Sequence, residues 1–162
     1  MRVIIGALIL AGAATAAGAA ARIVFAGGNW AAIDFGSRCE ARSKALWTKP
    51  KTQPYAGFAF GRAEGPQGLF YAHLSRPARS GTAVMATIGS EPFLLGGKGD
   101  WAWSQGAAQR TALLDATRYG SSLRIIYRDT SGRRVVDHYA LGGAATAIDA
   151  AAATCAGKSA LS

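Results

Sequence analysis

Short runs in which apolar residues alternate with small or polar ones follow one another along most of this sequence, and they restrict the folds open to it. In the clearest run, Tyr55–Arg62, Tyr55 and Gly57 fall on one face of an extended segment and Phe58 and Phe60 on the other. This period of two is typical of a β-strand with one buried face. Further strands are expected at 29–35, 38–45, 69–75, 82–88, 92–95, 123–128 and 133–141.

Two segments have a helical period instead. Ser104 is expected to cap a helix over 105–119, which Gly120 ends in a left-handed conformation. The Ala-rich segment 144–155 predicts a closing helix. Because strands and helices do not alternate as in parallel α/β folds, we expect a mainly β (α+β) fold. It would be an antiparallel β-sandwich or curled sheet with one internal helix and a C-terminal Ala-rich helix.

The turn 129–132 is expected to join the last two strands into a hairpin. With a four-residue loop, Arg124 would lie opposite Asp137 as a cross-strand ion pair.

Residues 1–21 have the pattern of a cleavable signal peptide. Arg2 precedes an apolar run, and a small-residue tail offers cleavage after Ala19 or Ala21. The alternative is an uncleaved anchor, although the Ala and Gly in the second half insert weakly into a bilayer. We expect export to the periplasm, with secretion as the alternative, a single domain over 22–162, and no membrane span after cleavage.

The chain is strongly basic. It has 18 Lys and Arg against 9 Asp and Glu, and removal of residues 1–21 takes away Arg2 alone, which leaves 17 against 9. Such a balance favours anionic envelope components as partners, or another envelope protein. The alternative is that the arginines reflect only the base composition of the genome. We expect no nucleic acid partner, and the oligomeric state stays open.

Two cysteines, Cys39 and Cys155, are expected to form a disulfide in an exported chain. The bridge would connect the second expected strand to the closing helix. Free or intermolecular thiols are the alternative, and neither cysteine has metal-ligand spacing.

No catalytic or cofactor motif is present in the sequence, and we expect no cofactor. Gly96-Gly97-Lys98-Gly99 lacks the spacing of a phosphate-binding loop and is interpreted as a tight turn. Of the two histidines, His138 follows Asp137 on a strand, so their side chains point to opposite faces. A triad of Ser75, His73 and an aspartate, or a metal held by both histidines and Asp34, stays a weaker alternative.

Four tryptophans are candidates for core or for binding. Trp30 is expected in the core. Trp101 and Trp103 share one face of an extended segment; core is the preferred interpretation, and an exposed stacking platform is the alternative. Trp47 lies beside Lys44, Lys49 and Lys51, which predicts contact with an anionic surface; lysines that are only solvated are the alternative.

The segments NWAAIDFGSRCEAR and YALGGAATAIDAAAATC, together with the leader, resemble the invasion-associated locus B family of exported bacterial proteins. The resemblance implies a β-sandwich-like exported domain and carries over no catalytic residue.

The sequence therefore favours a non-catalytic envelope-associated binding module. A small periplasmic hydrolase with a site around His73 or His138, and a structural oligomeric envelope protein, are the alternatives.

Overall fold

A computed structural model describes residues 20–47, 53–62 and 67–157. The described chain contains ten strands and two helices: β1 (Arg22–Gly27), β2 (Trp30–Asp34), β3 (Arg38–Lys44), β4 (Tyr55–Gly61), β5 (Gln67–His73), β6 (Val84–Ile88), β7 (Glu91–Lys98), β8 (Trp101–Trp103), α1 (Gly106–Tyr119), β9 (Ser122–Arg128), β10 (Arg134–Ala140) and α2 (Ala144–Gly157).

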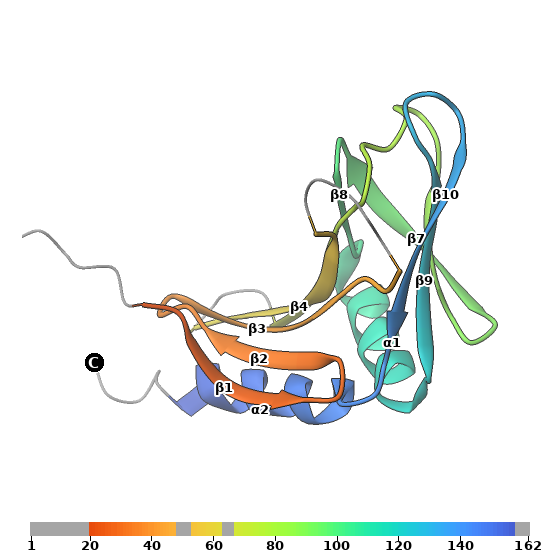
Figure 1. Cartoon of the computed structure of the whole chain (residues 1–162). Helices are drawn as coiled ribbons and strands as arrows, with labels where there is room; N and C mark the ends of the chain where they lie inside the picture. Colours follow the sequence, from red (N-terminus) through yellow and green to blue (C-terminus); the bar gives the residue numbers. More distant parts are fainter. Residues whose placement is uncertain (1–19, 48–52, 63–66, 158–162) are drawn as a thin grey trace, which may run out of the picture.

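The strands form one sheet in the order β1-β2-β3-β4-β5-β8-β7-β6-β9-β10, and every pair of neighbours is antiparallel. The first five strands follow one another as a meander, and β8 then pairs with both β5 and β7 (Figure 1). The prediction of a mainly β fold with an internal helix and a C-terminal helix is confirmed.

Both helices pack on the same face of the sheet, here called the inner face. α2 lies along β1, β2 and β3, and α1 packs on β5 and β7 (Figure 1). Inner positions alternate with outer ones along each strand. Phe58 of β4 and Phe70 of β5 are buried there in edge-to-face contact, with ring centroids 5.3 Å apart.

Trp30 lies in this core, as the sequence predicts, with only 2% of its surface exposed. Its ring stacks on Phe58 at 6.4 Å, and its indole Nε1 donates to the carbonyl of Ala140, 2.9 Å away. A second long-range contact lies near it, where the amide of Leu46 donates to the carbonyl of His138 at 2.7 Å. The end of β3 is therefore connected by backbone contact to β10, the last strand of the sheet.

The predicted disulfide is present. Cys39 on β3 and Cys155 in the last turn of α2 are bonded, their Cα atoms lie 5.7 Å apart, and both side chains are buried. The bond fixes the closing helix to the inner face, as the sequence predicts.

The prediction of an ion pair between Arg124 and Asp137 is wrong. Arg128 pairs with Arg134, so five residues (129–133) lie between the paired strand ends instead of the expected four, and His138 is the partner of Arg124. Asp137 is instead buried and turned toward the interior.

Both predicted ends of the internal helix need correction. Ser104 does not cap α1; its hydroxyl accepts a hydrogen bond from the Phe70 amide at 3.2 Å, and Gln105 occupies the N-cap position. Gly120 is extended, with φ −78° and ψ 162°, not left-handed. A Cβ there would lie 2.5 Å from Ile88 Cγ2, so close packing explains the glycine.

Two further segments differ from the expectation. Gly96 to Lys98 belong to β7, and the turn begins only at Gly99, because the strand continues to pair with β8. β1 was not anticipated as a strand.

The predicted signal peptide falls almost entirely outside the described residues, as do Lys49 and Lys51. Within the described chain, neither helix has the length and apolar character that a membrane crossing requires.

Candidate functional site

Five side chains form a row across the outer face of the sheet. Lys44 on β3, Tyr55 on β4, His73 on β5, Trp101 on β8 and Lys98 on β7 are successive cross-strand partners. Direct partners in an antiparallel pair point to the same side of the sheet. We call this set the aromatic row; it has three rings at its centre and a lysine at each end.

The rings of the aromatic row contact one another. His73 stacks on Tyr55 with centroids 5.4 Å apart and planes 15° apart. Trp101 meets both rings edge to face, at 4.9 Å from His73 and 6.0 Å from Tyr55. Trp101 keeps 40% of its surface exposed, so the cluster offers an apolar surface to solvent, because neither described helix packs on this face.

A second row lies beside the first. Arg42, Gly57, Tyr71, Trp103 and Gly96 are partners across the same five strands. A Cβ on Gly57 would lie 2.7 Å from the Arg42 Cβ, and one on Gly96 would lie 2.7 Å from the Trp103 indole nitrogen. The two glycines therefore let the side chains of Arg42 and Trp103 pack directly against the strand backbone.

A buried carboxylate organises the cationic end of this face. Glu40 is 4% exposed and accepts hydrogen bonds from the Tyr71 hydroxyl at 2.5 Å and the Arg38 Nε at 2.6 Å. Arg42 Nη1 lies 3.7 Å from its second oxygen, and the Arg42 guanidinium stands 5.0 Å over the Tyr55 ring. Burial, with the charge of Glu40, raises the pKa of Tyr71 far above its usual value.

An apolar hollow of about 680 Å³ continues this face toward β1. Ile23, Ala31 and Ile33 supply part of its apolar wall, and Arg42 and Tyr55 stand where it meets the aromatic row. The outer face therefore joins a hollow, a ring cluster and flanking cations in one continuous surface.

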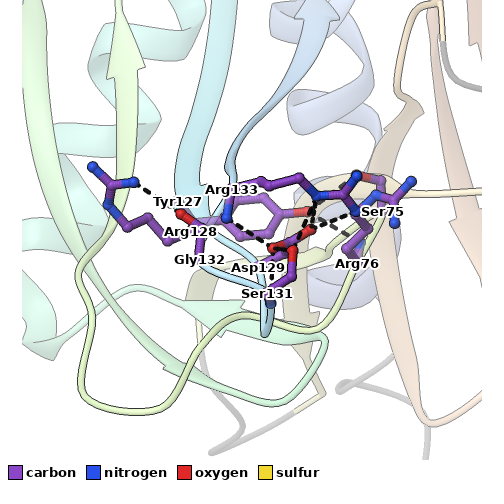
Figure 2. Close-up of polar contacts among 8 residues, drawn as sticks. All are labelled: Ser75, Arg76, Tyr127, Arg128, Asp129, Ser131, Gly132 and Arg133. Carbon is purple, nitrogen blue, oxygen red and sulfur yellow. Dashed lines mark hydrogen bonds and ion pairs between the residues drawn. The ribbon is translucent and has the colours of Figure 1, made fainter.

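His73 is held in place by Asp100, and no hydroxyl or thiol of the described residues hydrogen-bonds to its ring. Its Nε2 donates to Asp100 Oδ2 at 3.0 Å, and Nδ1 has no hydrogen-bond partner among the described residues. Ser75 does not complete a triad, because its hydroxyl pairs with the Tyr127 hydroxyl at 3.0 Å (Figure 2). The same Tyr127 oxygen accepts the Arg76 amide at 3.1 Å.

Tyr127 belongs to a buried polar set at the other end of the sheet. Its hydroxyl donates to Asp137 Oδ2 at 3.3 Å, and the Ser75 amide donates to the same oxygen at 2.9 Å. Burial raises the pKa of Tyr127 to about 12. These contacts satisfy the hydrogen-bonding groups of buried polar side chains, and they give Ser75 a structural role.

The remaining metal and catalytic hypotheses gain no support. His138 contacts Trp47, with ring centroids 5.7 Å apart, and Asp34 accepts Arg62 Nη2 at 2.7 Å. In the described ranges no three His, Cys, Asp or Glu residues lie close enough to hold a metal ion.

The structure separates the predicted binding residues. Trp101 and Trp103 are 40% and 38% exposed, so the preferred core interpretation is wrong, and a role as a stacking platform stays a prediction. Trp47 is 86% exposed, and its ring contacts His138 and none of the described rings of the aromatic row. Lys49 and Lys51 cannot be placed, because they lie outside the described residues.

The residues that surround the tryptophans were missed at the sequence level. Tyr71, Glu40 and Asp100 carry no motif, and Tyr55 and His73 were seen only in separate strands. The strand register would have found them, since it pairs Tyr55 with His73 and His73 with Trp101.

Comparisons of the chain with protein-family models, with curated proteins and with solved structures found no match.

Proposed function

We propose that this protein is an exported, non-catalytic binding module that holds an anionic ligand of the cell envelope on the outer face of its sheet. One observation carries the proposal: the exposed Trp101 and its neighbouring rings stand between Lys44 and Lys98 on a face that no described helix covers. An apolar surface between cations suits a ligand that has both apolar and anionic groups.

The cellular location is part of the proposal. Residues 1–21 have the signal-peptide pattern, and β1 begins at Arg22, so cleavage after Ala21 would remove no strand. The Cys39–Cys155 disulfide is in keeping with an oxidising compartment. The resemblance to the invasion-associated locus B family points the same way, to the periplasm or secretion.

For the fold, we propose a single curled sheet and not a sandwich of two sheets. The ten strands follow one another through hydrogen-bonded neighbours without a break, and the contact between Leu46 and His138 joins the end of β3 to β10. Two separate sheets packed face to face would have no such continuous order.

The hydrolase alternative has one observation in its favour, the 3.0 Å contact between His73 and Asp100. A hydrolase that forms a covalent intermediate through this pair needs a hydroxyl or thiol at the other nitrogen of His73. Ser75 is engaged by Tyr127, and Cys39 and Cys155 are joined to each other. The arrangement of His73 therefore favours a positioning role in the aromatic row.

Co-sedimentation with outer-membrane vesicles tests the proposal. The protein is purified from a periplasmic extract and mixed with vesicles at low and high salt. We expect binding at low salt that high salt abolishes, because exposed charges are screened within about 10 Å at 0.1 M salt. A Lys44→Gln/Lys98→Gln variant is expected to bind less.

The matched control is Arg124→Gln/Arg134→Gln, which removes the same charge from exposed positions on β9 and β10. Vesicle binding that is equally weak in both variants would mean that net charge alone acts. Absence of binding at either salt would overturn the proposal and favour a soluble protein partner or an oligomer.

A further inference from the structure

We infer that the ligand of the aromatic row is a linear acidic polysaccharide, a polymer of hydroxyl-rich sugars that carry spaced carboxylates. The inference rests on the proposed function and specifies its ligand class. It is drawn from the length of the row, from the mixture of charges on it and from the arrangement of its rings.

The length of the row favours a polymer. Lys44 and Lys98 are separated by four strand spacings, which is roughly 19 Å at about 4.8 Å each. Both lysines are exposed. A small anion can reach one of them, whereas a chain laid across the strands can pair with both and cover the rings between them.

The acidic side chains near the row favour a ligand whose anionic groups lie far apart over one whose anionic groups are closely spaced. Asp100 is 45% exposed beside His73, and Glu40 lies under Arg42 and Tyr71 on the same face. A single-stranded nucleic acid carries one negative charge per nucleotide, and it would bring phosphates near Asp100. A polysaccharide brings hydroxyl donors as well, which a carboxylate accepts, and it places its own anions further apart.

The geometry of the rings also argues against bases. Trp101 is inclined by 81° to Tyr55 and by 71° to His73, so the rings do not form a parallel ladder. Sequence-independent binding of single strands depends on ring faces on which successive flat bases stack. The apolar C–H groups of a sugar can instead pack on the exposed surface of a single tilted ring.

The test uses a short oligogalacturonate as the acidic probe. Its matched controls are the neutral oligogalactoside of the same length, the acidic disaccharide and an oligothymidylate. Binding is measured by calorimetry and by tryptophan fluorescence on the protein purified after export. We expect the acidic oligomer to bind at least about tenfold more tightly than each control. The disaccharide reaches only one lysine and part of the ring surface, the neutral oligomer pairs with neither lysine, and the oligothymidylate brings phosphates near Asp100.

Variants locate the site. Trp101→Ala and Lys44→Gln/Lys98→Gln are each expected to weaken binding by about tenfold, the effect of losing one ring contact or two exposed ion pairs. Trp47→Ala and Arg124→Gln/Arg134→Gln are expected to bind as the unmodified protein does. Thermal unfolding and the retained disulfide confirm that each variant is folded.

The outcomes separate the two proposals. Vesicle binding without oligogalacturonate binding, or tighter binding of oligothymidylate, would overturn the inference that the ligand is an acidic polysaccharide. The proposal of an envelope-binding module would still stand. An equal loss of affinity in the Trp47 and Trp101 variants would overturn the placement of the site. Failure to bind vesicles and oligomer alike would overturn the proposed function itself.

Discussion

The two faces of the sheet from β3 to β8 are built from the same strands and differ in what covers them. On the inner face Phe58, Phe70 and Cys39 are buried under α1 and α2. On the outer face Tyr55 and Trp101 keep solvent contact although they lie one residue away from buried neighbours. The inner face is completed by the protein's own helices, whereas the rings of the outer face remain open.

The difference indicates what each face contributes. Burial of apolar surface is the main source of folding stability, so the inner face should carry most of the free energy of unfolding. Exposed aromatic side chains in one continuous cluster add less to folding and are typical of an interaction surface. Substitutions matched across the two faces can break or sharpen this comparison.

The largest contrast is expected between Phe58 and Tyr55, which lie on opposite faces of β4. Phe58→Ala should lower the free energy of unfolding by about 4 kcal/mol, because it removes a fully buried ring and leaves a cavity. Tyr55→Ala should lower it by about 1 kcal/mol, the scale of its ring contacts. Urea denaturation at neutral pH measures both. Equal losses would mean that the outer rings belong to the core.

The disulfide is expected to have the next largest effect. Replacement of Cys39 and Cys155 together by serine should cost about 3 kcal/mol, since the bond closes a loop of 116 residues in the unfolded chain. Chemical denaturation of the variant, and of the unmodified protein with and without reductant, measures this. The reduced protein should match the variant. A stability that reduction leaves unchanged would show that α2 is held by packing on the inner face alone.

The smallest effect is expected at a polar site away from both faces, the hairpin of β9 and β10 (Figure 2). Hydrogen bonds from Ser131 first, and then from Arg133, lower the pKa of Asp129 from 3.8 to about 2. Because the folded pKa is the lower one, this stabilisation is present above about pH 4 and is lost as the pH falls through 2.

Melting temperatures at neutral pH and near pH 2 test this prediction. The difference between the unmodified protein and Asp129→Asn should be small at neutral pH and should shrink in acid. Ser131→Ala should reduce the same difference, since it removes the largest contribution to the shift. A difference that persists unchanged in acid would show that the charge of Asp129 has no part in stability.

Much of the local structure follows from the sequence alone. The period of two in Tyr55–Arg62 and the Ala-rich period of 144–155 identify a strand and a helix, because backbone geometry fixes which side chains share a face. Two cysteines allow one intramolecular bond, and so the pair Cys39–Cys155 could be named in advance. The Asp129–Gly132 turn is also a local signal.

The strand register and the site were decided by the tertiary structure. One additional residue in the hairpin loop moved Arg124 opposite His138, and turned an expected ion pair into a buried Asp137. The exposure of Trp101 likewise depends on which face the helices cover, and the sequence around Trp101 does not predict that face. Alternating residues along a strand show only that its two faces differ. The packing of α1 and α2 decides which face becomes the core and which face stays exposed to solvent.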